Sequence, residues 1–218
     1  VEILPDKRIN YVTLLDDGKI AVGTWGGAVF YDDGKWSLLT TDDGLLTNMV
    51  NFILKDSDSG MWFGSNSVIE GGITYIRNGS AKHFTVEDGL PHCNVSSIIE
   101  DRNDTIWVGG GLHDAGGVAC FTKGKKGYSI DSSFEKSKHL YDIKVRSMYE
   151  DFEGNMWFGF EYDGVLCVKE KSEVLFTKDD GLSDNEVKDI VQDSDGSYWI
   201  GTRDGITYIP GDYKISGI

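Results

Sequence analysis

The feature that most constrains this chain is a ten-residue pattern that recurs along its length. The last copy reads DSDGSYWIGT and runs from residue 193 to residue 202. Earlier copies read DSDSGMWFGS (56–65), DRNDTIWVGG (101–110), DFEGNMWFGF (151–160) and, in a shorter form without tryptophan, DGKIAVGT (17–24). The positions aligned with the tryptophan are 21, 62, 107, 157 and 199, so the copies are 41, 45, 50 and 42 residues apart. A period of this length indicates a propeller or a solenoid.

Each copy lies within the same predicted succession of four strands. A stretch rich in Val and Ile precedes the aspartate turn, and a short tryptophan strand follows it. A glycine-led apolar strand and a less regular outer strand complete the unit, with Asp-Gly or Asn-Gly at the hairpin turns. Because no segment has the 3.6-residue period of a helical solenoid, we predict an all-β fold. It is a β-propeller of five four-stranded antiparallel blades, with repeats at about 9–47, 48–92, 93–142, 143–184 and 185–218.

The tryptophan positions and the chain ends give two further predictions. Trp62, Trp107, Trp157 and Trp199 should lie largely buried between blades. An open ring would leave unpaired edges, so either Val1–Leu4 or 214–218 should supply the last outer strand. The alternation in VEIL favours the N-terminal strand, because Gly217 weakens the other segment. Residues 1–218 would then form a single propeller domain.

Composition excludes some functions. The 218 residues carry a net charge of −15 and no stripe of Lys and Arg with interleaved aromatics, so a nucleic-acid partner is not expected. No apolar run reaches the length that spans a bilayer, so we expect no membrane span. Cys120 and Cys167 occupy positions that hold Phe or Tyr in other repeats, which predicts buried thiols.

The connections between repeats also recur. TDDGL (41–45), VEDGL (86–90) and KDDGL (178–182) each precede an asparagine and then the next strand. Asp-Gly provides the sharp turn, and the leucine should fill the space between neighbouring blades. We interpret these segments as crossovers from an outer strand to the next inner strand.

Together, the D-x-x-G-x-x-W-x-G-T pattern and the x-x-D-G-L-x-x-N-x-V crossover resemble the two-component-regulator propeller repeat. That family forms periplasmic or extracellular sensor regions of bacterial hybrid histidine kinases and also occurs as stand-alone propellers. The resemblance implies a periplasmic or extracellular location and a signalling kinase as partner or parent chain. It covers nearly the whole sequence, although the third copy loses DGL and carries an insert at 124–141.

Candidate site residues come from the variable loops rather than the repeated strands. The loops between second and third strands and the crossovers share one face of a propeller, and these loops differ between the repeats. The candidate ligand-binding residues are Trp25, Asn66, His92, His113, Asp114, Glu161, Tyr162 and Arg203. Trp25 and Tyr162 could stack on sugar rings, and the polar groups could bind hydroxyls.

Three functions remain open on this evidence. The favoured one is a non-catalytic propeller that senses or recognises a small molecule or glycan, without a cofactor or a metal. The second is a propeller enzyme, a lyase or glycan hydrolase, in which His92 and His113 approach each other and act with carboxylates such as Asp114. The third is a scaffold that binds proteins through an exposed apolar edge.

Overall fold

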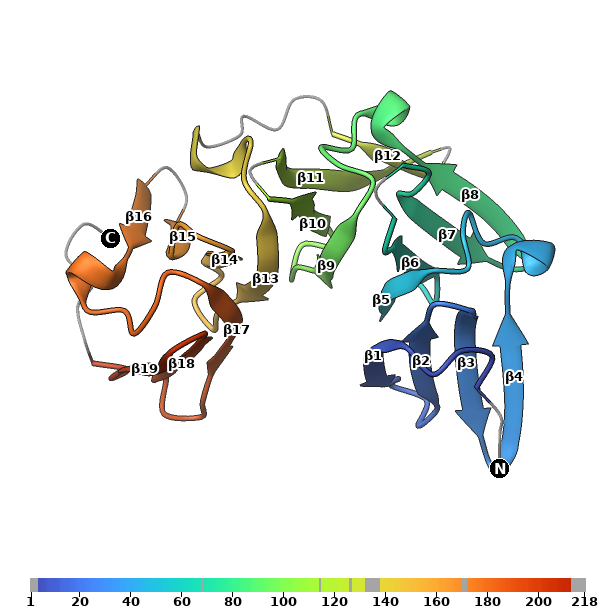
Figure 1. Cartoon of the computed structure of the whole chain (residues 1–218), viewed down its shortest axis with the longest axis horizontal. Helices are drawn as coiled ribbons and strands as arrows, with labels where there is room; N and C mark the ends of the chain where they lie inside the picture. The colour runs from blue at the N-terminus through green and yellow to red at the C-terminus, as the bar shows by residue number, and fades with distance from the viewer. Residues whose placement is uncertain are drawn as a thin grey trace.

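The computed structural model describes residues 4–67, 69–113, 115–125, 127–131, 138–169 and 172–212. Their strands form five separate antiparallel sheets, each built from strands consecutive in the chain. Four sheets have four strands, and the described part of the fifth has three, in the order β17-β18-β19. The sheets follow one another around a common centre as an open arc, with the first and last blades at its two ends (Figure 1). The predicted propeller blades are therefore confirmed.

The strands fall into four equivalent sets. The inner strands are β1 (Ile9–Leu14), β5 (Val50–Lys55), β9 (Val95–Glu100), β13 (Val145–Glu150) and β17 (Val187–Gln192). The second strands are β2 (Ile20–Thr24), β6 (Met61–Ser65), β10 (Ile106–Leu112), β14 (Met156–Phe160) and β18 (Tyr198–Thr202). The third strands are β3 (Gly27–Asp32), β7 (Ile73–Arg77), β11 (Ala115–Gly124), β15 (Val165–Lys169) and β19 (Gly205–Ile209). The outer strands are β4 (Lys35–Leu39), β8 (Ser80–Phe84), β12 (Gly127–Ile130) and β16 (Ser172–Phe176).

The glycine two residues after each tryptophan lets neighbouring blades approach. A Cβ at Gly64 would lie 2.7 Å from the Val95 side chain of the next inner strand, and one at Gly159 would lie 2.5 Å from Val187. Real Cβ atoms do not make such contacts, so a larger residue would force the blades apart. Gly201 in the last blade has nothing closer than 3.8 Å. The repeated W-x-G therefore reports close packing of one blade against the next.

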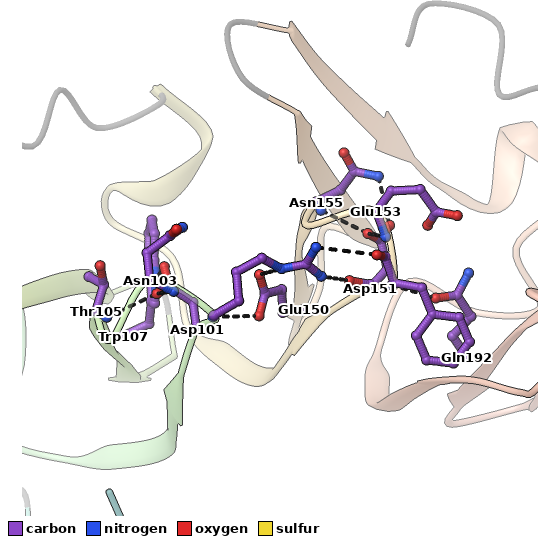
Figure 2. Close-up of polar contacts among 11 residues, drawn as sticks. Asp101, Asn103, Thr105, Trp107, Glu150, Asp151, Glu153, Asn155 and Gln192 are labelled. Atoms are coloured by element: carbon purple, nitrogen blue, oxygen red, sulfur yellow. Dashed lines mark hydrogen bonds and ion pairs between the residues drawn. The ribbon is translucent and has the colours of Figure 1, made fainter. Parts of the chain in front are cut away.

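The aspartate turns are built on a hydrogen bond between the first aspartate and the tryptophan. The indole Nε1 of Trp107 donates to Asp101 at 2.8 Å (Figure 2). The Nε1 of Trp157 donates to Asp151 at the same distance. The same carboxylates also accept backbone N–H groups of their own turns. The pattern DxxGxxW is therefore a structural unit that fixes a hairpin against the face of its blade.

Blade 1 lacks both partners of this pair. Its turn closes with a hydrogen bond from the Leu15 N–H to Lys19, as the Asp56 N–H bonds Gly60 in blade 2. Leu15 is therefore the equivalent of Asp56, and Ala21 is the equivalent of Trp62. Both replacements are buried. An unpaired buried carboxylate or indole N–H would be costly, and blade 1 avoids this cost because both polar partners are absent.

The turns also bind the next blade along the chain. Each turn contacts the residue that ends the following inner strand. The four contacts are Lys55 Nζ with Asp16 Oδ1 at 2.5 Å, Ser57 N to Glu100 at 2.7 Å, Arg102 N to Glu150 at 2.9 Å and Phe152 N to Gln192 at 2.8 Å. One polar contact of this kind therefore connects every consecutive pair of blades.

The burial prediction for the four tryptophans is only partly right. Trp62 and Trp157 are fully buried, and Trp107 is half-buried. Trp199 is 42% exposed, so its predicted burial is wrong. It faces the open side of the last blade, where Tyr208 and Ile206 are also exposed. Trp199 occupies the same strand position as the other three tryptophans. Among the described residues, no following blade covers it.

The crossovers contain short 3-10 helices at Thr41–Asp43 (η1), Val86–Asp88 (η2) and Lys178–Asp180 (η4). In each, a threonine N-cap and the third-position aspartate form a capping box, and a left-handed glycine ends the helix. Leu45, Leu90 and Leu182 are buried, as predicted for the leucine of DGL. The third crossover has its own 3-10 helix at Lys138–Leu140 (η3), with Leu140 in the buried position.

The predicted ring closure stays a prediction. Residues 1–3 and 213–218 lie outside the described residues. Leu4 belongs to no strand, and Pro5 lies against the β2–β3 loop of blade 1, since a Cβ at Gly26 would lie 2.9 Å from it. The single-domain prediction is likewise untested.

The predicted burial of the Cys120 and Cys167 thiols is confirmed, and Cys93 is also a buried free thiol. Within the described part of the chain, no helix has the length and apolarity needed to cross a bilayer.

Candidate functional site

The candidate site is the end of the blades that carries the second-to-third strand loops and the crossovers, here called the loop rim. Antiparallel strand order places both kinds of connection at this end. In every blade a loop N–H donates to a carbonyl just before the inner strand. These bonds run from Trp25 to Arg8, Asn66 to Met49, Gly111 to Asn94, Glu161 to Lys144 and Arg203 to Glu186. Trp25, Asn66, Gly111, Glu161 and Arg203 are therefore structurally equivalent positions.

The first two of these positions carry neutral side chains with defined partners. The Arg8 guanidinium lies 4.0 Å from the centre of the Trp25 ring, and the Trp25 indole donates to Asn10 Oδ1 at 3.3 Å. Asn66 Oδ1 accepts from Asn94 Nδ2 at 2.9 Å. One face of the Trp25 ring is thus occupied by a cation, and the residue is 37% exposed.

The fourth and fifth positions belong to an ionic cluster. Glu161 contacts Lys144 Nζ at 2.7 Å and Arg146 at 2.8 Å. Burial raises the pKa of Glu161, but the contacts with Lys144 and Arg146 outweigh it, so that the pKa is lowered. Arg146 also reaches Glu186 at 3.1 Å, and Arg203 lies 3.8 Å from Glu186. The cluster holds Glu161 ionised and leaves Arg203 largely exposed.

The two histidines of the predicted pair each have a defined local setting. His92 Nδ1 accepts the N–H of Asn94 at 2.9 Å, and burial, followed by the charge of Lys144, lowers its pKa. His113 is exposed at the tip of the β10–β11 hairpin, with a left-handed φ of 51°. No contact joins the two rings among the described residues, and Asp114 lies outside them. Each histidine thus has a place in the local backbone structure. His92 accepts a backbone N–H in a crossover, and His113 occupies a left-handed position in a turn.

Tyr162 follows the rim position of Glu161 in the chain and is 52% exposed. The described residues contain no group of three His, Cys, Asp or Glu side chains arranged as metal ligands. The rim therefore offers two exposed aromatic rings, an exposed arginine and amide groups. This set can stack on a ring and bind hydroxyls.

Sequence reasoning missed a series of inner-strand side chains next to the rim. Asn10 and Asn51 donate to the carbonyls of Val50 and Val95 in the next blade, at 3.0 and 2.6 Å. Ser96 bonds the Val145 carbonyl in the same way. The fourth member, Arg146, instead binds the two glutamates of the ionic cluster. These side chains could have been identified in the sequence, because each belongs to the residue that follows the first Ile or Val of an inner strand.

Comparison with known proteins supports the resemblance of the sequence repeats to the two-component-regulator propeller repeat. The family model described as "Two component regulator propeller" matches residues 89–111 and 181–204. Two segments of the chain therefore match the two-component-regulator propeller repeat. No curated protein matches the chain.

Solved structures with the same fold include two much longer proteins. One is the extracellular domain of the putative hybrid two component system BT3049 from B. thetaiotaomicron (TM-score 0.75, 19% identity, 94% of this chain and 28% of that one). Another is PorZ, a bacterial surface component of the type-IX secretion system of Porphyromonas gingivalis (TM-score 0.74, 16% identity, 99% and 34%). This chain thus spans about a third or less of the length of these neighbours.

A third similar structure is an enzyme, virginiamycin B lyase from Staphylococcus aureus (TM-score 0.65, 19% identity, 93% of this chain and 70% of that one). At such low identity these likenesses establish the propeller fold alone.

Proposed function

We propose that this chain is a non-catalytic recognition propeller of two-component signalling that binds a small molecule or glycan on its loop rim. The observation that carries the proposal is the contrast between backbone and side chains at the rim. The same backbone hydrogen bond occurs in all five blades, while the residues that make it are Trp25, Asn66, Gly111, Glu161 and Arg203. A repeated scaffold that presents different side chains at one edge is typical of a binding surface.

The exposed rim groups suit a ligand with a flat or ring-shaped apolar face and several hydroxyls. Trp25 and Tyr162 supply aromatic surface, and Arg203 supplies donors that are not fully engaged by Glu186. Similarity to an extracellular domain of a hybrid two-component system supports a periplasmic or extracellular location and a kinase in the same chain or as partner.

A binding screen tests the proposal. Thermal shift with a panel of oligosaccharides and metabolites identifies a ligand, and calorimetry then measures its Kd for the wild type and for Trp25→Ala, Tyr162→Ala and Arg203→Ala. We expect each rim variant to weaken binding by about tenfold or more, about 1.4 kcal/mol.

The matched control is Phe152→Ala. Phe152 has similar exposure but lies in the aspartate turn at the opposite end of blade 4. The proposal fails if the rim variants bind as the wild type does, or if Phe152→Ala weakens binding as much as they do.

A further inference from the structure

One face of blade 5 is exposed at positions that are covered in the other blades. Ile206 pairs with Gly201 of the neighbouring strand and is 66% exposed. The residues that pair with the corresponding glycine in blades 1 to 4 are all 0% or fully buried: Ala28, Ile73, Val118 and Val165. Tyr208, which pairs with Trp199, is 48% exposed. Its counterparts Tyr75, Cys120 and Cys167 are buried.

These side chains form one apolar surface, here called the blade 5 face. It consists of Val191, Trp199, Ile206 and Tyr208, which share one side of the sheet because strand residues alternate between its two sides. The opposite side of the sheet is buried against blade 4. The terminal repeat of an array normally has a polar outer face. Blade 5 instead presents the apolar face of an internal repeat.

The interface between blades 4 and 5 shows what covers such a face. Trp157, Val165 and Cys167 of blade 4 pack against Val187 and Ile190 of the next inner strand. Val187 also lies against Gly159, where an added Cβ would be 2.5 Å from its side chain. In blade 5, a Cβ at Gly201 would meet only the carbonyl oxygen of Asp189, at 3.8 Å. The blade 5 face thus has the room over its glycine that a valine or isoleucine fills elsewhere.

The aspartate turn of blade 5 adds a polar requirement. In blades 2 to 4, the N–H that follows the first aspartate donates to the last side chain of the next inner strand. These acceptors are Glu100, Glu150 and Gln192. Ser194 holds the donor position in blade 5, and it is exposed, with no acceptor for its N–H among the described residues. A covering blade that reproduces this contact needs Glu or Gln at the end of its inner strand.

Blade 1 does not meet this requirement. Its inner strand ends at Leu14, whose side chain contains no hydrogen-bond acceptor. Blade 1 also lies at the other end of the arc from blade 5 (Figure 1). Neither a ring closed at five blades nor contact with blade 1 of a second copy would therefore give the Ser194 N–H its usual partner. The blade interfaces that the structure contains all join blades consecutive in the chain.

We propose that the blade 5 face is the interface for a sixth blade of the same repeat type, joined to blade 5 by a crossover. The inner strand of this blade begins with Val or Ile, which lies over Gly201, and ends with Glu or Gln, which accepts the Ser194 N–H. Its apolar side chains cover Trp199, Ile206 and Tyr208. This interface goes beyond ligand recognition, and its test does not depend on binding at the loop rim.

The test appends a blade to the complete 218-residue chain. One extended protein carries a second copy of residues 178–218 after Ile218, and another carries a copy of residues 138–184. The copied inner strands begin with Val187 or Val145 and end with Gln192 or Glu150. Two different copies are used so that misfolding of one appended blade does not decide the result.

Exposure of the blade 5 face is measured with Ile206→Cys in the original blade 5, treated with a disulfide reagent at pH 8. The native thiols of the described chain are buried. Labelling in the extended proteins should be at least about tenfold slower than in the unextended chain, because the interface must then open first. The Ser194 N–H should also exchange more slowly with solvent by NMR. Phe152→Cys, in the exposed turn of blade 4, is the matched control and should react equally in both.

Two substitutions separate a specific interface from unspecific cover. Gly201→Ala should leave the Tm of the unextended chain unchanged or raise it, because glycine weakens a strand and the added Cβ has room. In the extended proteins it should remove most of the protection, since the Cβ would meet the appended valine. In the copy of residues 178–218, Gln192→Leu should restore fast exchange of the Ser194 N–H while Ile206→Cys stays protected.

Three results would overturn the proposal. One is equal labelling of Ile206→Cys in the unextended chain and in both extended proteins. Another is protection that persists unchanged in Gly201→Ala, which would mean that the appended chain covers the face without blade packing. The third is sedimentation showing that the unextended chain forms oligomers that Ile206→Asp dissociates. That result would assign the blade 5 face to a second copy of the chain.

Discussion

The aspartate of the turn in blade 4 should be far more important for stability than its counterpart in blade 5. Asp151 is 1% exposed, and its carboxylate accepts bonds from two backbone N–H groups and from the side chains of Asn155, Trp157 and Tyr198. The equivalent Asp193 bonds Trp199 at 2.8 Å on the open side of the arc.

The substitutions Asp151→Asn and Asp193→Asn compare the two turns at constant size. In Asp151→Asn, the new amide group faces either the three side-chain donors or the two backbone donors, so at least two buried donors lose their acceptor. At about 1–3 kcal/mol for each unsatisfied donor, the free energy of unfolding should fall by about 3–5 kcal/mol. Water can reach the exposed Trp199, so Asp193→Asn should cost about 1 kcal/mol.

Urea denaturation followed by circular dichroism measures both free energies. At roughly 2–4 °C per kcal/mol for a chain of this size, Tm should fall by roughly 6–20 °C for Asp151→Asn and by about 4 °C or less for Asp193→Asn. Equal losses in the two variants would refute the argument that burial of the network sets its value.

The Asp151 carboxylate should also make the free energy of unfolding depend on pH. Burial raises the pKa of Asp151, but the bonds from Trp157, Asn155 and Tyr198 outweigh it, and the pKa is lowered. A depressed folded pKa gives stability that is present above the unfolded value of about 4 and is lost as the pH falls through the folded value. Asp151→Asn should therefore lose less additional stability than the wild type below about pH 4. Parallel stability curves for the two proteins in acid would contradict this.

Three further predictions concern buried groups. Trp157→Ala should lower the free energy of unfolding by about 3–5 kcal/mol, and Trp199→Ala should lower it by less than half as much, because Trp199 is already exposed; equal losses in urea denaturation would contradict the burial difference. Asp56→Leu and Trp62→Phe should be less damaging together than the sum of the single changes, with a coupling of about 0.5–3 kcal/mol in a double-mutant cycle; additive losses would show that the pair does not act as a unit. Burial, with the nearby charge of Asp151, raises the pKa of the Cys167 thiol to about 12, so Cys167 should react with a disulfide reagent at pH 8 only after unfolding, and rapid labelling of the native protein would be the contrary result.

The fold could be predicted because its signals are local and repeated. The turn, the tryptophan and the following glycine lie within ten residues, and the structure explains each by a contact of fixed geometry. The exposure of Trp199 could not be predicted in this way. Its own sequence context matches that of Trp157, and the difference depends on which surface lies beside the blade.

The candidate site was predictable in location but less so in chemistry. Loop parity placed Glu161 and Arg203 at one end of the blades, since it depends only on strand order. It could not show that Glu161 is engaged by Lys144 and Arg146, or that His92 bonds a backbone N–H. Those partners come from neighbouring crossovers and inner strands, and their contacts depend on side-chain directions that spacing does not specify.

Blade 1 shows how strongly the scaffold constrains its own residues. Where the other blades have an aspartate and a tryptophan, it has Leu15 and Ala21, and both are buried. Loss of either partner alone would leave a buried polar group unpaired, so the polar pair is absent as a whole. The rim positions follow no such rule: Trp25, Glu161 and Arg203 share one backbone role with unrelated side chains. The packing positions of a blade thus hold a matched pair, whereas the equivalent rim positions of different blades hold side chains of different chemistry, as expected under the proposed recognition function.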